Sequence, residues 1–278
     1  MATAREPDSM PDPHFPVRAL SPESQPSLEY SFCSLVTDLH EYREMVSRFE
    51  ASGFRAGDCE FLYADNSNGN RFDAFAAYNR FLIEARGRYI VLCHQDILPL
   101  EHDRERLDRL LKELTAHDPL WALCGNGGAR SDGRYVYNIT HGASIRLDQG
   151  GPYPVRVMSL DENFLVVRRD ANLALSRDLT GFHWYAADLC IVADLLGWNA
   201  YVIDFHLFHK STGNITQSFT EQGDALRRKY SRAFRPRWHY VPTKRPVYLA
   251  SSPVRTFVMR AARSAYRRFK LRFDRSFE

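Results

Sequence analysis

Five consecutive apolar residues, Tyr89 to Cys93, run directly into His94, Gln95 and Asp96. Because the run contains no alternation of polar and apolar residues, it predicts a β-strand buried on both faces, as in a parallel sheet covered by helices. The imidazole of His94 and the carboxylate of Asp96 would then lie at the carboxyl end of that strand, where open α/β sheets bind ligands. The competing interpretation is a strand that simply ends in polar loop residues.

The same succession of apolar strands and amphipathic helices recurs along the first half of the chain. Four strands are expected, at residues 30–38, 59–64, 89–93 and 121–128. Helices are expected between them, at residues 39–53, 72–87 and 104–119. This alternation predicts βαβ units and an α/β fold with a mainly parallel central sheet. Further along, the sequence predicts β-rich insertions at 133–147 and 155–170, a helix at 182–199 and a strand at 200–213.

The composition is that of an ordinary globular protein. At 278 residues and 44% hydrophobic content the chain can bury one large core, and its net charge of +3 argues against an overall nucleic-acid footprint. The five cysteines are widely spaced without a Cys-x-x-Cys pair, which favours reduced thiols in a cytoplasmic protein over disulfides or zinc. No apolar run is long enough to span a membrane. The proline-rich residues 1–29 are expected to form a disordered tail.

Potential metal ligands follow several of the expected strands. Asp65 and Asn66 follow the second strand, His94 and Asp96 follow the third, and His206 and His209 end the last. Carboxylate and imidazole ligands from distant segments suit Mn²⁺ or Mg²⁺ bridging a diphosphate. The residue types alone leave open that these are ordinary loop residues with local hydrogen-bond partners.

Several motifs, in this order, resemble those of family 2 glycosyltransferases of the GT-A fold. They are VTD, ADNSNGN, AAYNRFLIEARGRYIVLCHQD, SLDENFLVVRRD and GFHWYAADLC followed by LFHKSTG. The resemblance covers residues 30–213 and implies a GT-A (nucleotide-diphospho-sugar transferase) domain over 30–220, followed by a basic helical extension over 221–278. It also implies a hexosyltransferase that moves sugar from a nucleotide sugar to a glycan or lipid-linked acceptor, with inversion, in surface polysaccharide or glycolipid synthesis.

The resemblance also implies roles for individual residues. The HQD sequence stands where the family has Asp-x-Asp, with His94 in place of the first aspartate. Asp96 and His209 would be the protein ligands of the Mn²⁺ or Mg²⁺ ion. His206 is better explained as a locally packed histidine, because the Ser and Gly of the motif follow His209. The nucleotide would be bound by Asp38, Asp65, Asn66 and Asp96.

The chain departs from the family at the position of the general base. Many inverting members carry the base as an aspartate at the start of the helix after the acceptor loop, and here that position is Ala186. Asp188 and Asp161 are the two alternative bases, although Asp188 is equally explained as a helix N-terminal carboxylate. His183 and Trp184 precede the helix and either bind the acceptor sugar by stacking or belong to the core.

The C-terminal residues 258–273 have the pattern of a basic amphipathic helix. One face would carry Val258, Ala262, Ala265, Tyr266, Phe269 and Phe273, and the other Arg260, Arg263, Arg267, Arg268 and Arg275. Such a helix suits an anionic membrane surface, which would place the enzyme peripherally at the inner face of a membrane. The alternatives are a helix packed on the catalytic domain and, less favoured, an RNA-binding segment.

Two other functions are compatible with the sequence. Ala186 motivates a catalytically silent protein that binds nucleotide sugars or acts as a scaffold. A nucleotidyltransferase would share the nucleotide-binding half, but it needs a glycine-rich phosphate loop after the first strand, and VTDLHEYRE contains no glycine.

Overall fold

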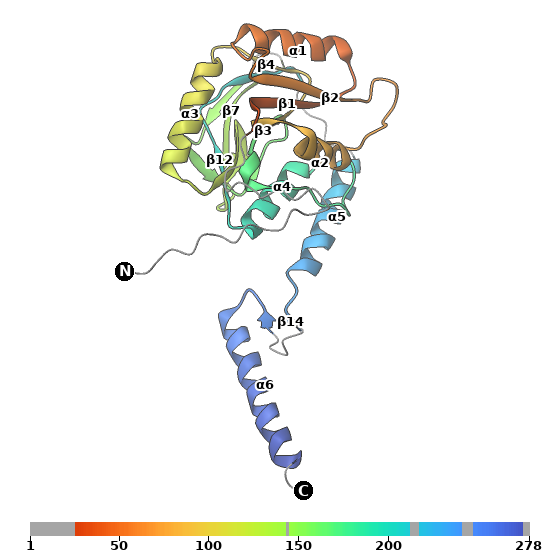
Figure 1. Ribbon diagram of the computed structural model, residues 1–278, viewed down its shortest axis with the longest axis vertical. Helices are drawn as coiled ribbons and strands as arrows, with labels where there is room; N and C mark the ends of the chain where they lie inside the picture. Colours follow the sequence, from red (N-terminus) through yellow and green to blue (C-terminus); the bar gives the residue numbers. More distant parts are fainter. Residues whose placement is uncertain (1–25, 143–144, 212–216, 241–246, 275–278) are drawn as a thin grey trace, which may run out of the picture.

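The computed structural model describes residues 26–142, 145–211, 217–240 and 247–274 (Figure 1). Most of the expected N-terminal tail therefore lies outside the described residues. Its last two residues, Leu28 and Glu29, instead begin strand β1 (Leu28–Val36). The backbone N–H of Glu29 donates to the carbonyl of Asp58 at 2.8 Å, so the strand starts two residues earlier than the sequence predicts.

Seven strands form the central sheet. In order they are β2 (Cys59–Asp65), β1, β3 (Gly87–Cys93), β11 (Phe164–Arg168), β5 (Trp121–Gly125), β12 (Asn199–Val202) and β9 (Val155–Val157). The predicted α/β fold with a central sheet is confirmed. The sheet is mixed, however, because β11 and β9 run antiparallel to their neighbours. The segment predicted to be an insertion at 155–170 thus supplies β11 in the middle of the sheet.

Helices cover both faces of this sheet (Figure 1). Helices α1 (Leu39–Ala51) and α3 (Arg104–His117) share one apolar core with the sheet, and α2 (Ala74–Glu84) and α4 (Tyr185–Leu195) share the other. Alternate residues of β1 point into the two cores. Phe32 packs on Phe49 of α1, with the ring centroids 4.8 Å apart, while Cys33 belongs to the core on the α2 side. Burial on both faces explains why the central strands read as continuous apolar runs.

A second sheet pairs the strand that follows the HQD turn with the strand that ends at His209. Its strands, in order, are β10 (Ser159–Leu160), β6 (Gly127–Ala129), β7 (Tyr135–His141), β13 (Leu207–His209) and β4 (Ile97–Pro99), with β8 (Ile145–Gln149) paired to β7. In the antiparallel β13–β4 pair, His209 lies opposite Ile97. This register brings His209 beside Asp96, which directly precedes β4.

The chain passes from the first sheet to the second through Gly125 and Gly127. A Cβ atom on Gly125 would lie 2.6 Å from the carbonyl oxygen of Phe164, a distance at which backbone would have to move. Only glycine allows β5 to approach the start of β11 this closely.

The C-terminal part contains α5 (Gln217–Ala233), a hairpin of β14 (Arg237–His239) and β15 (Val247–Leu249), and α6 (Pro253–Asp274). The expected boundary at residue 220 falls inside α5, and Tyr230 of that helix bonds to Asp188 of α4. The predicted helix at 258–273 is confirmed as part of α6, which begins five residues earlier. Figure 1 shows α6 standing apart from the main body. No helix in the described residues is both long and apolar enough to cross a membrane.

Candidate metal and nucleotide site

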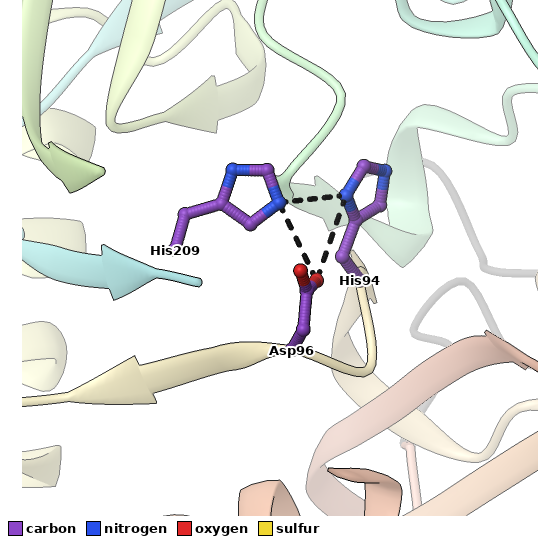
Figure 2. Close-up of side chains that lie close together, drawn as sticks. All are labelled: His94, Asp96 and His209. Atoms are coloured by element: carbon purple, nitrogen blue, oxygen red, sulfur yellow. Dashed lines mark hydrogen bonds and ion pairs between the residues drawn. The ribbon is translucent and has the colours of Figure 1, made fainter. Parts of the chain in front are cut away.

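The side chains of His94, Asp96 and His209 converge at the carboxyl edge of the central sheet (Figure 2). His94 and Asp96 belong to the turn between β3 and β4, and His209 ends β13. His94 Nδ1 lies 3.1 Å from His209 Nε2, and Asp96 Oδ1 lies 3.4 Å from the same nitrogen. The third distance, from His94 Nδ1 to Asp96 Oδ1, is 4.0 Å.

This spacing fits a small octahedral cation. With bonds of about 2.1 Å, adjacent ligand atoms lie about 3.0 Å apart and opposite ones about 4.2 Å. The three distances span this range, and one carboxylate with two imidazoles is a donor set that Mn²⁺ accepts. The expected pair of Asp96 and His209 is brought together, and His94 joins it as a third ligand that the sequence argument did not assign to the metal.

The tautomer of His94 suits metal binding. Tyr185 Oη donates to the backbone carbonyl of Glu162 at 2.9 Å, so toward His94 Nε2, at 3.1 Å, its oxygen accepts. His94 Nε2 then carries the hydrogen and Nδ1 keeps its lone pair toward the cluster. Burial lowers the pKa of His94 and the adjacent His209 lowers it further, which keeps the ring neutral near pH 7.

Asp96 is held as a carboxylate anion. Burial alone would raise its pKa, but hydrogen bonding and charge from His209, the charge of His94 and a hydrogen bond from Ser211 outweigh it and lower the pKa well below the usual range. The backbone N–H of Ser211 donates to Asp96 Oδ2 at 3.2 Å. Ser211 Oγ lies 3.0 Å from His209 Nε2. The backbone N–H of Ser211 therefore orients Asp96, a role that the sequence did not indicate, whereas its hydroxyl faces the His209 nitrogen that a metal would occupy.

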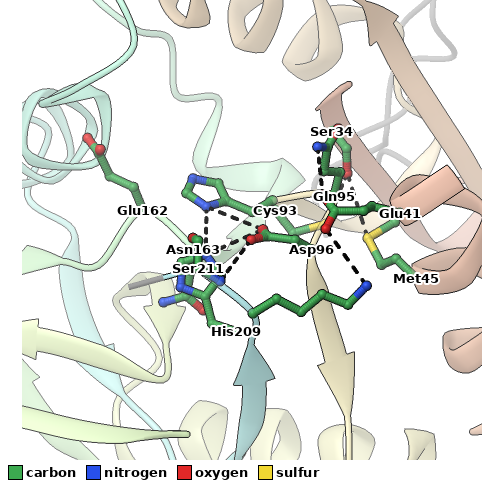
Figure 3. A network of polar contacts seen from close by, with 12 residues as sticks. Ser34, Glu41, Met45, Cys93, Gln95, Asp96, Glu162, Asn163, His209 and Ser211 are labelled. Carbon is green, nitrogen blue, oxygen red and sulfur yellow. Dashed lines mark hydrogen bonds and ion pairs between the residues drawn. The ribbon is translucent and has the colours of Figure 1, made fainter. Parts of the chain in front are cut away.

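Figure 3 shows the polar network that continues from the cluster toward β1 and α1. Gln95 Oε1 accepts hydrogen bonds from the backbone N–H groups of Thr37 at 2.7 Å and Asp38 at 3.0 Å. The middle residue of the HQD turn thus ties it to the end of β1. Lys210 follows His209, and its ammonium group forms an ion pair with Glu44 of α1 at 2.7 Å.

The predicted nucleotide-binding residues have unequal roles. Asp38 is exposed and caps α1 by accepting from the N–H groups of His40 and Glu41, whose hydrogen bonds lower its pKa. Asp65 accepts from the hydroxyl of Ser67 at 2.6 Å and from its N–H at 2.9 Å, in a turn at the end of β2. Both carboxylates lie at the carboxyl edge of the sheet, where β1 and β2 end, and their contact with a nucleotide stays a prediction.

Asn66, the third residue expected to bind the nucleotide, is mostly buried and bonded within its own loop. It is 4% exposed, and its Oδ1 accepts from the N–H groups of Arg71 and Phe72, both at 3.0 Å. Its Nδ2 donates to the carbonyl of Phe72 at 2.8 Å. These bonds use both acceptor sites of Oδ1 and one of the two Nδ2 hydrogens, so Asn66 shapes the loop that follows β2, and a contact with the nucleoside stays a prediction.

Asp188 is not placed to act as a general base. Its side chain is fully buried and accepts from Ser176 N–H and Oγ, both at 2.7 Å, and from Tyr230 Oη at 2.6 Å. Three donors compensate the buried charge and join α4 to α5. The structure therefore corrects this expectation, since an acceptor hydroxyl cannot reach the carboxylate.

Asp161 lies closer to the cluster. Its Oδ1 accepts from the N–H and the Nδ2 of Asn163 at 3.0 and 2.6 Å, and its charge partly opposes the lowering of the His94 pKa by burial. The adjacent Glu162 accepts from the N–H groups at the start of α4, yet burial raises its pKa to about 8. In Figure 3 its side chain points away from the cluster.

No protein-family model matches the chain. The protein "ATP synthase subunits region ORF 6" of Fuscovulum blasticum is 35% identical over 219 residues, covering 76% of this chain and 87% of that protein. The chain belongs to the family of this ORF 6 protein. The name describes a position in a gene region and states no activity.

Three solved structures are similar in fold at low identity. A197 from STIV is 10% identical with a TM-score of 0.39 over 81% of this chain and 96% of that one. GalNAc-T7 with UDP, GalNAc and Mn²⁺ is 8% identical with a TM-score of 0.45, over 69% and 46%. The mannosyltransferase PcManGT of Pyrobaculum calidifontis, with GDP-Man and Mn²⁺, is 12% identical with a TM-score of 0.47, over 73% and 66%. GalNAc-T7 and PcManGT are glycosyltransferases with GT-A-like folds.

The predicted acceptor-binding residues of this ORF 6 family member lie against α5. Trp184 Nε1 donates to the carbonyl of Phe219 at 2.8 Å, and the two rings pack at 4.7 Å. His183 contacts the Phe219 ring edge-on, and its N–H donates to Gln222 at 2.9 Å. Both residues therefore position α5, and a role in acceptor binding stays a prediction.

His206 is packed locally, as the sequence favoured. It is 2% exposed, and its Nε2 lies 2.8 Å from Thr140 Oγ1. Its backbone N–H donates to His102 Nδ1 at 2.8 Å. The ring has no place in the cluster of His94, Asp96 and His209.

Proposed function

We propose that this protein is a metal-dependent glycosyltransferase that moves a hexosyl group from a nucleotide sugar to a glycan or lipid-linked acceptor. The observation that carries the proposal is the convergence of His94, Asp96 and His209 at the ligand-binding edge of an α/β sheet. The order of motifs that resembles family 2 glycosyltransferases supports it, with HQD in the place of Asp-x-Asp. The proposed role is in surface polysaccharide or glycolipid synthesis.

His94 Nδ1, Asp96 and His209 Nε2 would hold Mn²⁺ or Mg²⁺. Bound there, the ion supplies Lewis-acid stabilisation of the charge that develops on the departing nucleoside diphosphate. Tyr185 orients His94 through Nε2, and the backbone N–H of Ser211 orients Asp96 through Oδ2. Asp65 and Asp38, at the ends of β2 and β1, are proposed to contact the nucleoside.

Asp161 is the proposed general base of an inverting transfer. It would take the proton of the acceptor hydroxyl as that oxygen attacks the anomeric carbon and the bond to the diphosphate breaks. Asn163 holds Asp161 Oδ1, and among the described residues no hydrogen bond to Oδ2 is seen. Asp161→Asn should therefore lower turnover by about 10²-fold or more and leave nucleotide affinity unchanged. Full turnover by this variant would exclude Asp161 as the base.

The metal assignment is tested by calorimetric titration of UDP, GDP and TDP with and without Mn²⁺. Asp96→Asn should abolish the Mn²⁺-dependent part of nucleotide binding, because it removes the only carboxylate from the cluster. Asp194→Asn is the matched control, since Asp194 is an exposed carboxylate at the far end of α4. Nucleotide binding by the wild type that ignores Mn²⁺ would refute the proposal.

A catalytically silent nucleotide-sugar-binding protein is the second candidate. Ala186, at the start of α4, brings no carboxylate to the position where the family carries its base. This candidate predicts metal-dependent binding of the donor without transfer and without slow hydrolysis of the donor sugar. Release of free sugar from a bound donor would exclude it.

A further inference from the structure

The outer surface of α6 carries large apolar side chains in contact with solvent. Val254 is 71% exposed, Phe257 74%, Val258 54% and Tyr266 67%. At about 100° per residue these four positions fall within one half of the helix circumference. An apolar strip of this kind on an exposed helix marks an interaction surface. We call these four residues the apolar strip.

The cationic half of α6 faces a different neighbour. The guanidinium of Arg263 lies over the rings of Trp238, at 4.7 Å, and Tyr240, at 5.6 Å. Because Arg263 points opposite to the apolar strip, the β14–β15 hairpin lies on the cationic side of the helix and leaves the strip facing outward. The alternative in which α6 packs its apolar face on the catalytic domain does not agree with these exposures.

The charge around the strip indicates what it contacts. Arg255 and Arg268 lie near its two edges, and Arg260 and Arg267 lie on the opposite half. The sequence contains no Asp or Glu between Pro253 and Phe273. A second copy of α6 would therefore bring like charges together, whereas an anionic surface would complement them. Arginines at the edges of an apolar face can keep their guanidinium groups at the level of lipid headgroups.

We infer that α6 lies in the plane of an anionic lipid bilayer, with Val254, Phe257, Val258 and Tyr266 inserted below the headgroups. The hairpin would then lie on the water side and connect the helix to the main body. This arrangement holds the main body at a membrane without a spanning segment. The inference does not depend on the proposed transferase activity.

The test is co-sedimentation of the full-length chain with vesicles of phosphatidylcholine alone or with added phosphatidylglycerol. Binding should require the anionic lipid and weaken as salt rises, because salt screens exposed charges. Each arginine near the surface contributes about fivefold to partitioning, so Arg255→Gln with Arg268→Gln should weaken binding by at least tenfold. The matched control is Arg43→Gln with Arg228→Gln, two exposed arginines on α1 and α5.

A second pair of variants tests insertion. Phe257→Ser should weaken vesicle binding about tenfold, whereas Ile83→Ser, on an equally exposed position of α2, should have no effect. Equal binding to neutral and anionic vesicles, or no binding to either, would overturn the inference. So would a dimer in sedimentation velocity that Phe257→Ser dissociates, since the strip would then bind a second copy. These assays use no nucleotide, so their outcome is independent of the transferase proposal.

Discussion

Replacing Tyr185 with phenylalanine tests whether its hydroxyl orients the His94 ring for metal binding. The Tyr185 hydroxyl joins His94 Nε2, at 3.1 Å, to the backbone carbonyl of Glu162, at 2.9 Å. Tyr185→Phe keeps the ring, which is 2% exposed and packs on Tyr78 at 4.7 Å, and removes only the hydroxyl. His94 would lose the partner that sets its tautomer, so Nδ1 and Nε2 would compete for the hydrogen.

Two magnitudes follow from the two bonds. Each contributes about 0.5–1.5 kcal/mol net to stability, so the free energy of unfolding should fall by about 1–3 kcal/mol. Loss of a hydrogen bond behind a metal ligand typically weakens metal affinity by about 10- to 100-fold. The variant should still be folded, so its modest loss of stability should not by itself change Mn²⁺ affinity. A loss of Mn²⁺ affinity of about 10- to 100-fold would therefore report on the orientation of His94.

Mn²⁺ titration by calorimetry, together with a urea unfolding curve, measures both effects. Tyr201→Phe is the matched control, because it also removes a hydroxyl from a buried tyrosine, which there bonds to Asp118 at 2.9 Å, but Tyr201 lies on β12 away from the cluster. We expect Tyr201→Phe to lower stability and to leave Mn²⁺ affinity unchanged. Equal Mn²⁺ affinity in Tyr185→Phe and the wild type would show that Tyr185 does not orient His94.

Two further predictions concern buried carboxyl groups. Asp188→Asn should lower the free energy of unfolding by about 1–3 kcal/mol, measured in urea, with Mn²⁺-dependent nucleotide binding intact; loss of that binding at full stability would contradict the structural role. Because burial raises the pKa of Glu162 from 4.5 to about 8, the native state holds an extra proton between these pH values, so its stability falls as pH rises. Glu162→Gln should remove this slope, at most about 1.4 kcal/mol per pH unit; parallel stability curves for variant and wild type from pH 5 to 8 would refute it.

The individual strands and helices could be predicted because their signals are local. Residues 89–93 are apolar without alternation, and β3 is buried on both faces as that pattern requires. The period of α6 is equally local, and the helix forms where the sequence predicts it. Asp96 and His209 were paired through the resemblance to a known family, and the cluster contains both.

Long-range pairing decided the rest. The apolar run at Phe164–Arg168 predicts a strand, but no local pattern says that it pairs antiparallel with β3 and β5 in the centre of the sheet. His94 joins the cluster because the β13–β4 register places His209 opposite Ile97, and that register depends on residues more than a hundred positions apart.

Burial likewise separates carboxylates that look alike in the sequence. Asp188 and Asp161 are both acidic residues near the expected acceptor loop. Only the packing of α5 against α4 brings Tyr230 to Asp188 and closes it off from solvent, whereas Asp161 stays partly exposed beside the cluster. The sequence by itself determined which residue types carry chemistry and which elements hold them. The tertiary structure decided which of them meet, because partner choice and desolvation are properties of packed elements and not of any one segment.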